Sequence, residues 1–274
     1  MSEQSHWQHV TPVLLPEELA LRYGSIRAVP VYGITEDITT WQCTDAVGQI
    51  RYCKVARLET TIPVDLADEA ERLHWCEQLA LGTPRVVEQG AYGSVTWLVT
   101  EEVPGVPLHV LKKSVSPRIL AASAGAALRA FHALPTGTCP WSASPQDLLQ
   151  CASHRVGNGL VNRDRDFHVE HAHLSFEEAL HILASDIPDG GKVLTHGDFC
   201  FPNILLDPQG MQLSGLIDLG RVAVGDPWWD LAIGSWSVEW NLGPGYEEPF
   251  FHAYGLPPDT AKIAWYRLAY DLVA

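Results

Sequence analysis

The chain has 274 residues, of which 46% are hydrophobic and 19% charged, a composition typical of a folded globular protein. Its 33 acidic residues outnumber the 18 Lys and Arg residues and leave a formal charge of −15. This charge makes nucleic acid and anionic membranes poor partners, and it favours a cationic substrate. No apolar run reaches the roughly 20 residues that cross a bilayer, and residues 1–10 lack the apolar core of a secretory signal. We therefore expect a cytoplasmic protein.

Six cysteines are scattered along the chain without a C-x-x-C pair, which argues against a zinc site and against a disulfide framework. We interpret them as buried thiols in a reducing compartment. The 12 histidines include one dense cluster, formed by His168, His171 and His173. We interpret this cluster as a solvated loop rather than as a metal site.

Residues 1–103 are expected to form strands with one helix. The predicted strands are Thr39–Thr44, Gln49–Ala56 and Val95–Thr100. The first two flank the turn-like tetrad Asp45–Gly48, so that they should form a hairpin. Asp65 can cap a helix whose apolar positions recur at intervals of three and four, and Gly82 is expected to end it.

From residue 104 onward the pattern becomes mainly helical. Helix starts are predicted at Ser116, at Ser175 with its capping-box partner Glu178, at Asp226 and at Asp259. Two short strands are expected around Ile204–Asp207 and Gln212–Ile217. The sequence thus indicates an α+β chain with a β-rich lobe over residues 1–103 and a helical lobe with an embedded hairpin over residues 104–274. A ligand site is expected where two such lobes meet.

The stretch that carries chemistry begins at His196-Gly197-Asp198, continues to Asn203 and ends at Asp218. Phosphoryl transfer needs a carboxylate that holds the acceptor hydroxyl and takes its proton. It also needs a second carboxylate and an amide oxygen for Mg²⁺, a hard ion that prefers oxygen ligands. A catalytic loop followed by a hairpin can supply both sets, because the hairpin returns the second carboxylate beside the first.

Each of these motifs also has a structural explanation. His196-Gly197-Asp198 can form a turn, Asn203 can cap a helix, and Asp218 can sit in a strand-end turn. The whole series in this order, with a hairpin inside it, is much rarer by chance. It therefore favours a kinase.

A kinase also needs a cation on the α- and β-phosphates, oriented by an acid on a helix. Lys54 on the second hairpin strand and Glu69 on the next helix occur in the expected order. The chain has neither G-x-G-x-x-G nor the Walker A motif G-x-x-x-x-G-K-[ST], which excludes a P-loop NTPase. The turn that would cover the phosphates, Gly33–Asp37, has one glycine, and phosphate contacts there would have to use Thr35.

With these residues, the chain resembles the aminoglycoside phosphotransferases, and in particular the aminoglycoside 3′-phosphotransferases (kanamycin kinases). The resemblance extends from near Gly33 to Leu272. The matching stretches are Asp68–Trp75, Thr83–Glu88, Trp97–Gly105, Phe131–Leu134, Arg155–Val161, Thr195–Asp198, Ser214–Arg221, Asp226–Ala232 and Trp265–Leu268. The segment Arg155–His171 resembles the substrate-lobe insertion of these enzymes, whereas choline, homoserine and fructosamine kinases share mainly the catalytic motif.

The resemblance implies a protein-kinase-like bilobal fold, with a nucleotide-binding lobe (1–103) and a catalytic, substrate-binding lobe (104–274). It implies ATP or GTP as the phosphoryl donor and Mg²⁺ as the cofactor. The implied roles are Asp198 as the catalytic Asp, Asn203 and Asp218 as metal ligands, Lys54 as the phosphate contact and Glu69 as its partner. Adenine would meet the backbone of Glu101 and Val103 at the hinge, next to Thr100.

Acidic side chains line the aminoglycoside site in this family, because the drug carries several ammonium groups. The resemblance assigns Asp164, Asp166, Glu170, Arg221, Glu239 and Asp271 to that site. Three positions depart from the family: His168 stands where an acid is usual, Arg165 is an insertion, and Tyr270 replaces an acid near the terminus. The site should therefore be less acidic and more aromatic than in most members.

We predict ATP-dependent transfer of the γ-phosphoryl group to the 3′-hydroxyl of an aminoglycoside antibiotic, which would confer resistance. Two alternatives stay open on the same fold: a streptomycin 3″-kinase, and a kinase of another amino sugar or small metabolite. A third is a nucleotide-binding pseudokinase, against which the complete set of catalytic residues argues. The protein is expected to act as a monomer or homodimer, with a cationic small molecule as its only partner class and with neither nucleic acid nor membrane.

Overall fold

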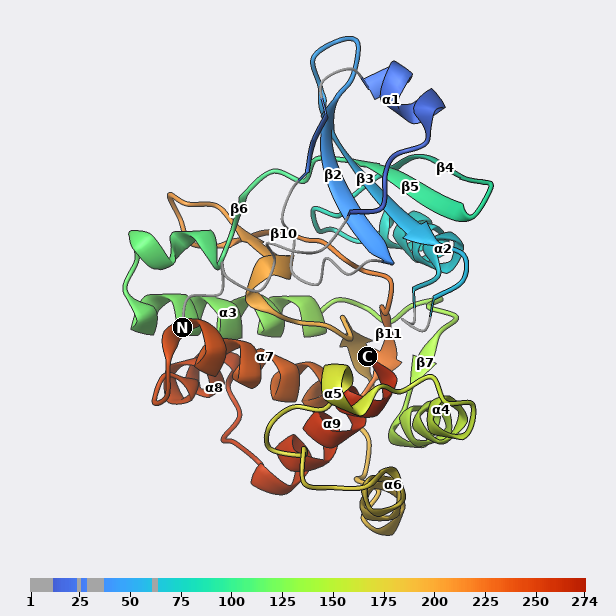
Figure 1. The fold of residues 1–274 in the computed structure, drawn as a ribbon. Coiled ribbons are helices and arrows are strands. Elements are labelled where there is room, and N and C mark those ends of the chain that lie inside the picture. Colours follow the sequence, from blue (N-terminus) through green and yellow to red (C-terminus); the bar gives the residue numbers. More distant parts are fainter. Residues whose placement is uncertain (1–11, 24–25, 29–36, 61–63) are drawn as a thin grey trace. The chain divides into compact units, whose positions relative to one another are not determined.

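The structure, a computed structural model, describes residues 12–23, 26–28, 37–60 and 64–274 (Figure 1). The chain divides into two compact units. Unit 1 comprises residues 1–78 and 82–103, and unit 2 comprises residues 79–81 and 104–274. Among the described residues, no helix is both long enough and apolar enough to span a bilayer.

Unit 1 is built on a five-stranded antiparallel sheet with the order β1-β2-β3-β5-β4 (Figure 1). Its strands are β1 (Ile26–Ala28), β2 (Ile38–Thr44), β3 (Ile50–Arg57), β4 (Val86–Tyr92) and β5 (Val95–Glu101). The predicted hairpin of β2 and β3 is confirmed. Its turn is held by Asp45, whose Oδ1 accepts the backbone N–H groups of Val47 and Gln49 at 3.0 and 2.8 Å. Gly48 supplies the left-handed residue of this turn, with φ +83°.

Helix α2 (Leu66–Cys76) packs against β4 and β5 and begins at the predicted cap, where Asp65 accepts two backbone N–H groups. The prediction that it continues to Gly82 is wrong. Glu77 and Gln78 are both exposed, so the apolar face that holds the helix on the sheet ends at Cys76.

The expectation of a single helix in unit 1 is also wrong. Helix α1 (Glu17–Tyr23) buries Leu19 and Tyr23 against a cluster that includes Cys43, Cys53 and Val99 of the sheet. At 7 residues, α1 is too short for its sequence to show a helical period, and its stability comes from this packing.

Unit 2 is mainly helical. Its helices are α3 (Pro117–His132), α4 (Pro145–Gly157), α5 (Arg163–Asp166), α6 (Phe176–Ser185), α7 (Pro227–Leu242), α8 (Glu247–Tyr254) and α9 (Thr260–Val273). The predicted caps Ser175, Asp226 and Asp259 each accept a backbone N–H at a helix start, whereas Ser116 precedes α3 without a side-chain cap bond. Helix α7 is central, with every residue from Trp228 to Val238 buried between its neighbours, which include α3, α8 and α9.

Six short strands of unit 2 form two three-stranded sheets. One has the order β10-β9-β6, from β6 (Val106–Pro107), β9 (Ile204–Leu206) and β10 (Leu213–Leu216). The other has the order β7-β11-β8, from β7 (Ser142–Ala143), β8 (Val193–Thr195) and β11 (Ala223–Gly225). Short 3-10 helices cover Val110–Lys113 and Phe201–Asn203. The predicted hairpin of β9 and β10 is confirmed, and it lies directly between the two halves of the catalytic motif.

Candidate active site

The loop that follows β8 is held by a buried carboxylate on α7. Asp230 is fully buried, and its Oδ2 accepts the backbone N–H of His196 at 2.7 Å while its Oδ1 accepts that of Gly197 at 2.8 Å. Nε2 of His132 on α3 lies 2.9 Å from the same Oδ2. Three donors from two segments therefore converge on one carboxylate, which fixes the loop backbone immediately before Asp198.

His196 joins this loop to the segment that leads to Asp218. Its Nδ1 accepts the N–H of Asp198 at 3.2 Å, so the ring proton lies on Nε2, which donates to the carbonyl oxygen of Ile217 at 3.0 Å. Gly197 has φ +83°, and a Cβ there would lie 2.6 Å from Cβ of Arg221. A larger residue would force these two segments apart, which explains the glycine between His196 and Asp198.

Asp198 and Asn203 are in direct contact. Nδ2 of Asn203 donates to both the backbone oxygen and Oδ2 of Asp198, each at 3.0 Å. Both amide protons of Asn203 are thereby directed at Asp198, which leaves its Oδ1 as an oxygen donor for a cation. Asn203 is buried, and Asp198 is partly buried.

Asp218 follows β10 in a left-handed backbone conformation, with φ +62°. A non-glycine residue in this region carries a strain on the order of 1–2 kcal/mol, and Asp is among the residues that tolerate it best. Desolvation, together with the charges of Asp198 and Asp218, holds the pKa of the Cys200 thiol well above its usual value. Sγ of Cys200 lies 4.0 Å from Oδ2 of Asp198, and the backbone N–H of Ile217, which precedes Asp218, donates to the carbonyl oxygen of Asn203 at 3.1 Å.

Two residues of unit 2 complete the surroundings of Asp198. The hydroxyl of Tyr270 on α9 donates to Oδ1 of Asp198 at 2.8 Å. The guanidinium carbon of Arg221 lies 5.8 Å from the centre of the Tyr270 ring. Nη1 of Arg221 is buried and has no hydrogen-bond partner among the residues that the structure describes.

In unit 1, Nζ of Lys54 on β3 lies 2.8 Å from both carboxylate oxygens of Glu69 on α2. The Glu69 side chain is 9% exposed and that of Lys54 is 20% exposed, so the pair is shielded from bulk water. The predicted association of these two residues is therefore present in the fold.

Thr100 and Glu101 end β5, and the N–H of Glu101 donates to the carbonyl of Arg85 at 2.9 Å. Val103 is buried, two residues further on. The predicted phosphate contact Thr35 lies outside the described residues.

The acids assigned to the substrate differ widely in their surroundings. Asp164 is exposed, Glu239 is partly buried, and Asp166 accepts the N–H of Asn162 at 2.8 Å. Glu170 pairs with Arg267 of α9 at 3.5 Å.

The Asp271 carboxylate is 2% exposed and is held by the backbone N–H of His168 and by the His171 ring. Its Oδ2 therefore already has two protein partners.

The interpretation of the histidine cluster as a solvated loop is wrong for two of its members. The centroid of the His168 ring lies 4.5 Å from that of Trp236 and 5.5 Å from that of Trp240. The centroid of the His171 ring lies 6.0 Å from that of Trp236. Only His173 is exposed. Among the described residues, no group of three or more His, Cys, Asp or Glu side chains is arranged to hold a metal ion.

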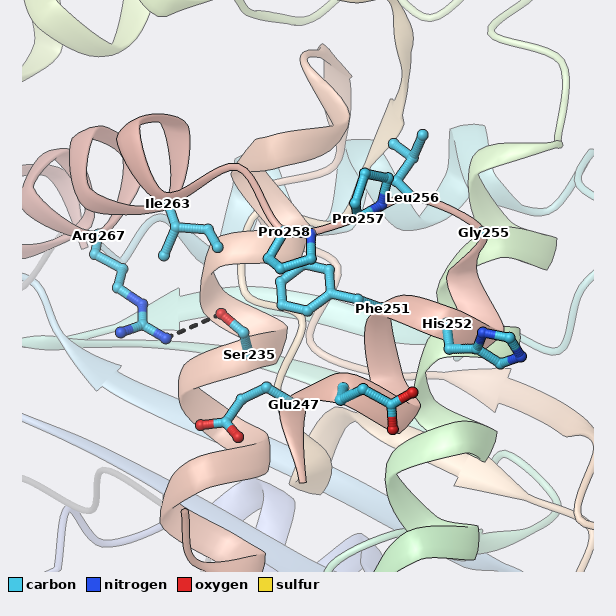
Figure 2. Close-up of a pocket in the computed structure, with 11 residues that line it drawn as sticks. Ser235, Glu247, Phe251, His252, Gly255, Leu256, Pro257, Pro258, Ile263 and Arg267 are labelled. Atoms are coloured by element: carbon cyan, nitrogen blue, oxygen red, sulfur yellow. Dashed lines mark hydrogen bonds between the residues drawn. The ribbon is translucent and has the colours of Figure 1, made fainter. Parts of the chain in front are cut away.

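A cavity of about 750 Å³ lies elsewhere in unit 2, between α7, α8 and α9 (Figure 2). Figure 2 shows Arg267 at its edge, where Nη2 donates to the Ser235 hydroxyl at 3.0 Å. Its lining includes the apolar side chains of Phe251, Pro258 and Ile263. None of the motif residues lines this cavity, so we place the candidate active site at Asp198.

Comparisons with known proteins agree with this choice. The family described as the phosphotransferase enzyme family matches residues 37–266. The chain belongs to this family. It is 37% identical to an aminoglycoside 3′-phosphotransferase of Streptomyces fradiae, over 79% of this chain and 83% of that protein.

Two solved structures are similar to this phosphotransferase. The crystal structure of an aminoglycoside 3′-phosphotransferase of type VIII is 33% identical, with a TM-score of 0.77 over 93% of this chain and 97% of that one. An aminoglycoside phosphotransferase from Streptomyces rimosus, in complex with ADP and streptomycin, is 26% identical, with a TM-score of 0.69 over 92% and 94%. The predicted resemblance, the kinase-like α+β fold and the enzyme class are confirmed.

Sequence reasoning missed three residues of the site. Asp230 and His132 fix the loop, and Tyr270 bonds Asp198 directly. The sequence shows that Tyr270 stands at an unusual position, but it contains no local signal that this hydroxyl meets a residue 72 positions away.

Proposed function

We propose that the enzyme transfers the γ-phosphoryl group of ATP to a hydroxyl of an aminoglycoside, at the 3′ position, and that this modification confers resistance to the drug. The observation that carries the proposal is the Asp198–Asn203 contact on a loop fixed by Asp230. The identity of 37% to an aminoglycoside 3′-phosphotransferase supports the substrate class and the position.

Asp198 would accept a hydrogen bond from the acceptor hydroxyl and take its proton as the bond between oxygen and phosphorus forms. The bond between the γ-phosphorus and the oxygen of ADP breaks in the same transfer. Because the transition state is loose, most of the rate gain would come from orienting the hydroxyl rather than from removing its proton early.

Magnesium fits the donor set of this site. Asn203 offers Oδ1, since Nδ2 is committed to Asp198, and Asp218 offers a carboxylate beside the same loop. These are the oxygen ligands that Mg²⁺ prefers. When bound, the ion would neutralise the charge of the nucleotide phosphates. Asn203 and Asp218 are the residues that would hold it.

In unit 1, Lys54 would contact the α- and β-phosphates, with Glu69 holding its ammonium group in place. Adenine would meet the backbone of Glu101 and Val103, next to Thr100. ATP is the proposed donor, with GTP as the alternative. Thr35 would contribute a further phosphate contact.

The substrate would be a polycation, and the formal charge of −15 supports this class by attracting it to the protein. We assign to its site Asp164, Asp166, Glu170, Arg221, Glu239 and Asp271. Asp164 and Glu239 are the acids with the greatest freedom to meet ammonium groups, whereas Glu170 is paired with Arg267. Asp271 would act through His168 and His171, because its carboxylate is buried between them. We propose a cytoplasmic monomer or homodimer, with no nucleic acid or membrane partner.

A streptomycin 3″-kinase is the second candidate. It is supported by the likeness to the Streptomyces rimosus enzyme solved with streptomycin, and by an aromatic neighbourhood in which Trp240 is 61% exposed. The same aromatic neighbourhood also supports a kinase of another small amino sugar. The presence of Lys54, Glu69, Asp198, Asn203 and Asp218 opposes a pseudokinase.

The test is a panel of kanamycin, neomycin and streptomycin with Mg·ATP in a coupled assay of ADP release. Mass spectrometry and NMR of the products would locate the phosphate, which we expect on the 3′-hydroxyl of the kanamycin and neomycin types. A phosphate on the 3″-hydroxyl of streptomycin alone would favour the second candidate. No transfer to any of the three drugs would refute the proposal.

Two variants test the assigned roles in the same assay. Asp198→Ala should lower kcat by roughly 10³-fold or more while ATP still binds, and Asp218→Ala should remove the Mg²⁺-dependent turnover. Asp207→Asn is the matched control, because Asp207 is an exposed carboxylate in the turn between β9 and β10. Near-normal turnover in Asp198→Ala would contradict the assignment of the catalytic Asp.

A further inference from the structure

The Asp198 carboxylate has a fixed donor on each of its two oxygens. Nδ2 of Asn203 donates to Oδ2 at 3.0 Å, and the hydroxyl of Tyr270 donates to Oδ1 at 2.8 Å. The first donor comes from the catalytic loop itself. The second comes from the last helix, α9, and therefore connects the orientation of this carboxylate to packing elsewhere in unit 2.

Tyr270 is always the donor in this pair. Burial, followed by the negative charge of Asp198, holds the pKa of the phenol well above its usual value, and Arg221 opposes this shift only in part. The phenol therefore keeps its proton at neutral pH, and a protonated hydroxyl facing a carboxylate oxygen donates to it.

The ring of Tyr270 is held on several sides. Its centroid lies 5.8 Å from that of Trp229 and 6.4 Å from that of Trp236, both on α7, and Arg221 lies over its face. Aromatic contacts of this geometry stabilise the ring position beyond the area that they bury. The hydroxyl cannot leave Asp198 by a simple side-chain rotation, because the ring would have to leave α7 as well.

We propose that Tyr270 is a positioning residue for Asp198, and that its hydroxyl fixes the orientation in which the carboxylate receives the acceptor. The proposal rests on the function proposed above. The acceptor hydroxyl then uses a lone pair that Tyr270 and Asn203 leave open. Its proton passes to Asp198, its oxygen bonds to phosphorus, and the bond from phosphorus to ADP breaks. Tyr270 keeps its own proton and is unchanged at the end.

This role makes a specific kinetic prediction for Tyr270→Phe, which removes the hydroxyl and keeps the ring. Oδ1 of the carboxylate loses its hydroxyl donor, while Oδ2 keeps Nδ2 of Asn203 and the weak thiol donor of Cys200 at 4.0 Å. We therefore expect kcat to fall about tenfold, the factor that corresponds to one hydrogen bond. KM for the aminoglycoside and for ATP should stay within twofold, because Tyr270 orients Asp198 rather than binding either substrate.

Tyr266→Phe is the matched control. Tyr266 lies one turn earlier on α9, its ring contacts the same Trp229, and its buried hydroxyl has no hydrogen-bond partner in the described part of the chain. We expect its kcat to stay within twofold of the parent enzyme. An equal loss in both variants, an unchanged kcat in Tyr270→Phe, or a rise in KM at constant kcat would each overturn the proposal.

A second measurement does not depend on the substrate. The urea midpoints of Tyr270→Phe, Asp198→Ala and the double variant form a double-mutant cycle. If the hydroxyl acts through Asp198, Tyr270→Phe should shift the midpoint in the parent enzyme and have little effect once Asp198 is replaced. Additive shifts would refute the contact. If the parent enzyme phosphorylates no aminoglycoside, the proposed function fails, and this cycle still decides whether the Tyr270 hydroxyl is coupled to Asp198.

Discussion

Asp230 offers the sharpest test of how the fold holds the active loop. The substitution Asp230→Asn keeps the size of the side chain and removes its charge. The carboxylate accepts from His196, Gly197 and His132 at 2.7, 2.8 and 2.9 Å, with two donors on Oδ2 and one on Oδ1. An amide has only one oxygen, so its NH₂ group must face at least one of these donors.

The loss of unfolding free energy is smallest when the amide oxygen takes the place of Oδ2 and the NH₂ group faces the N–H of Gly197. That buried N–H is then unsatisfied, which costs about 1–3 kcal/mol. The other two bonds change from charge-assisted to neutral, which removes about 1 kcal/mol more. We therefore expect a loss of roughly 3 kcal/mol of unfolding free energy and, because Gly197 directly precedes Asp198, a fall in kcat of about 10–100-fold.

Urea denaturation and steady-state kinetics measure the two effects. Asp226→Asn is the control, because Asp226 is also a buried carboxylate near the start of α7 but bonds the N–H groups of Trp228 and Gly191 instead of the catalytic loop. Asp226→Asn should lower the free energy of unfolding but keep kcat within about threefold of the parent enzyme, since the loop before Asp198 retains its geometry. If Asp230→Asn retains both the parent urea midpoint and the parent kcat, Asp230 does not hold the loop.

Two further predictions concern unit 1 and the packing of unit 2. Glu69→Gln should lower kcat/KM for ATP about tenfold, because Lys54 loses its charged partner. Asp68→Asn on the same helix should stay within twofold, and equal losses would contradict a special role for Glu69. Gly125→Ala should destabilise the protein by at least about 1–3 kcal/mol in urea, because a Cβ there would lie 2.1 Å from a backbone oxygen of α8. Gly157→Ala meets nothing within 4 Å and should be neutral or stabilising, so equal effects would refute the steric argument.

Several features that depend on residues close in sequence were predicted, among them the turn at Asp45 and the capping box at Ser175. The turn at Asp45 and the capping boxes at Ser144 and Ser175 all consist of hydrogen bonds between residues two to four positions apart, and the second of these boxes was predicted. The catalytic series is likewise local, because a short hairpin connects Asn203 to Asp218. The types of neighbouring residues are enough to predict such features, since residues a few positions apart can meet in only a few backbone conformations.

Elements held by distant packing were not predictable in this way. Helix α1 is stable because Leu19 and Tyr23 cover the sheet, and α8 has no counterpart among the predicted helices. The end of α2 was misplaced for the same reason, because the sheet, and not Gly82, limits its apolar face. Helix α4 was also not predicted, although the capping box at Ser144 is a local signal for its start.

The sequence by itself predicted which groups would carry out the chemistry, because Lys54, Glu69, Asp198, Asn203 and Asp218 stand out by type, order and spacing. Only the tertiary structure decided how they are held. Asp230 reaches the loop from α7, Tyr270 reaches Asp198 from α9, and Asp271 turns inward to His168 and His171. These contacts arise when helices pack around α7, and a hydrogen bond between residues brought together by packing has no fixed spacing along the chain.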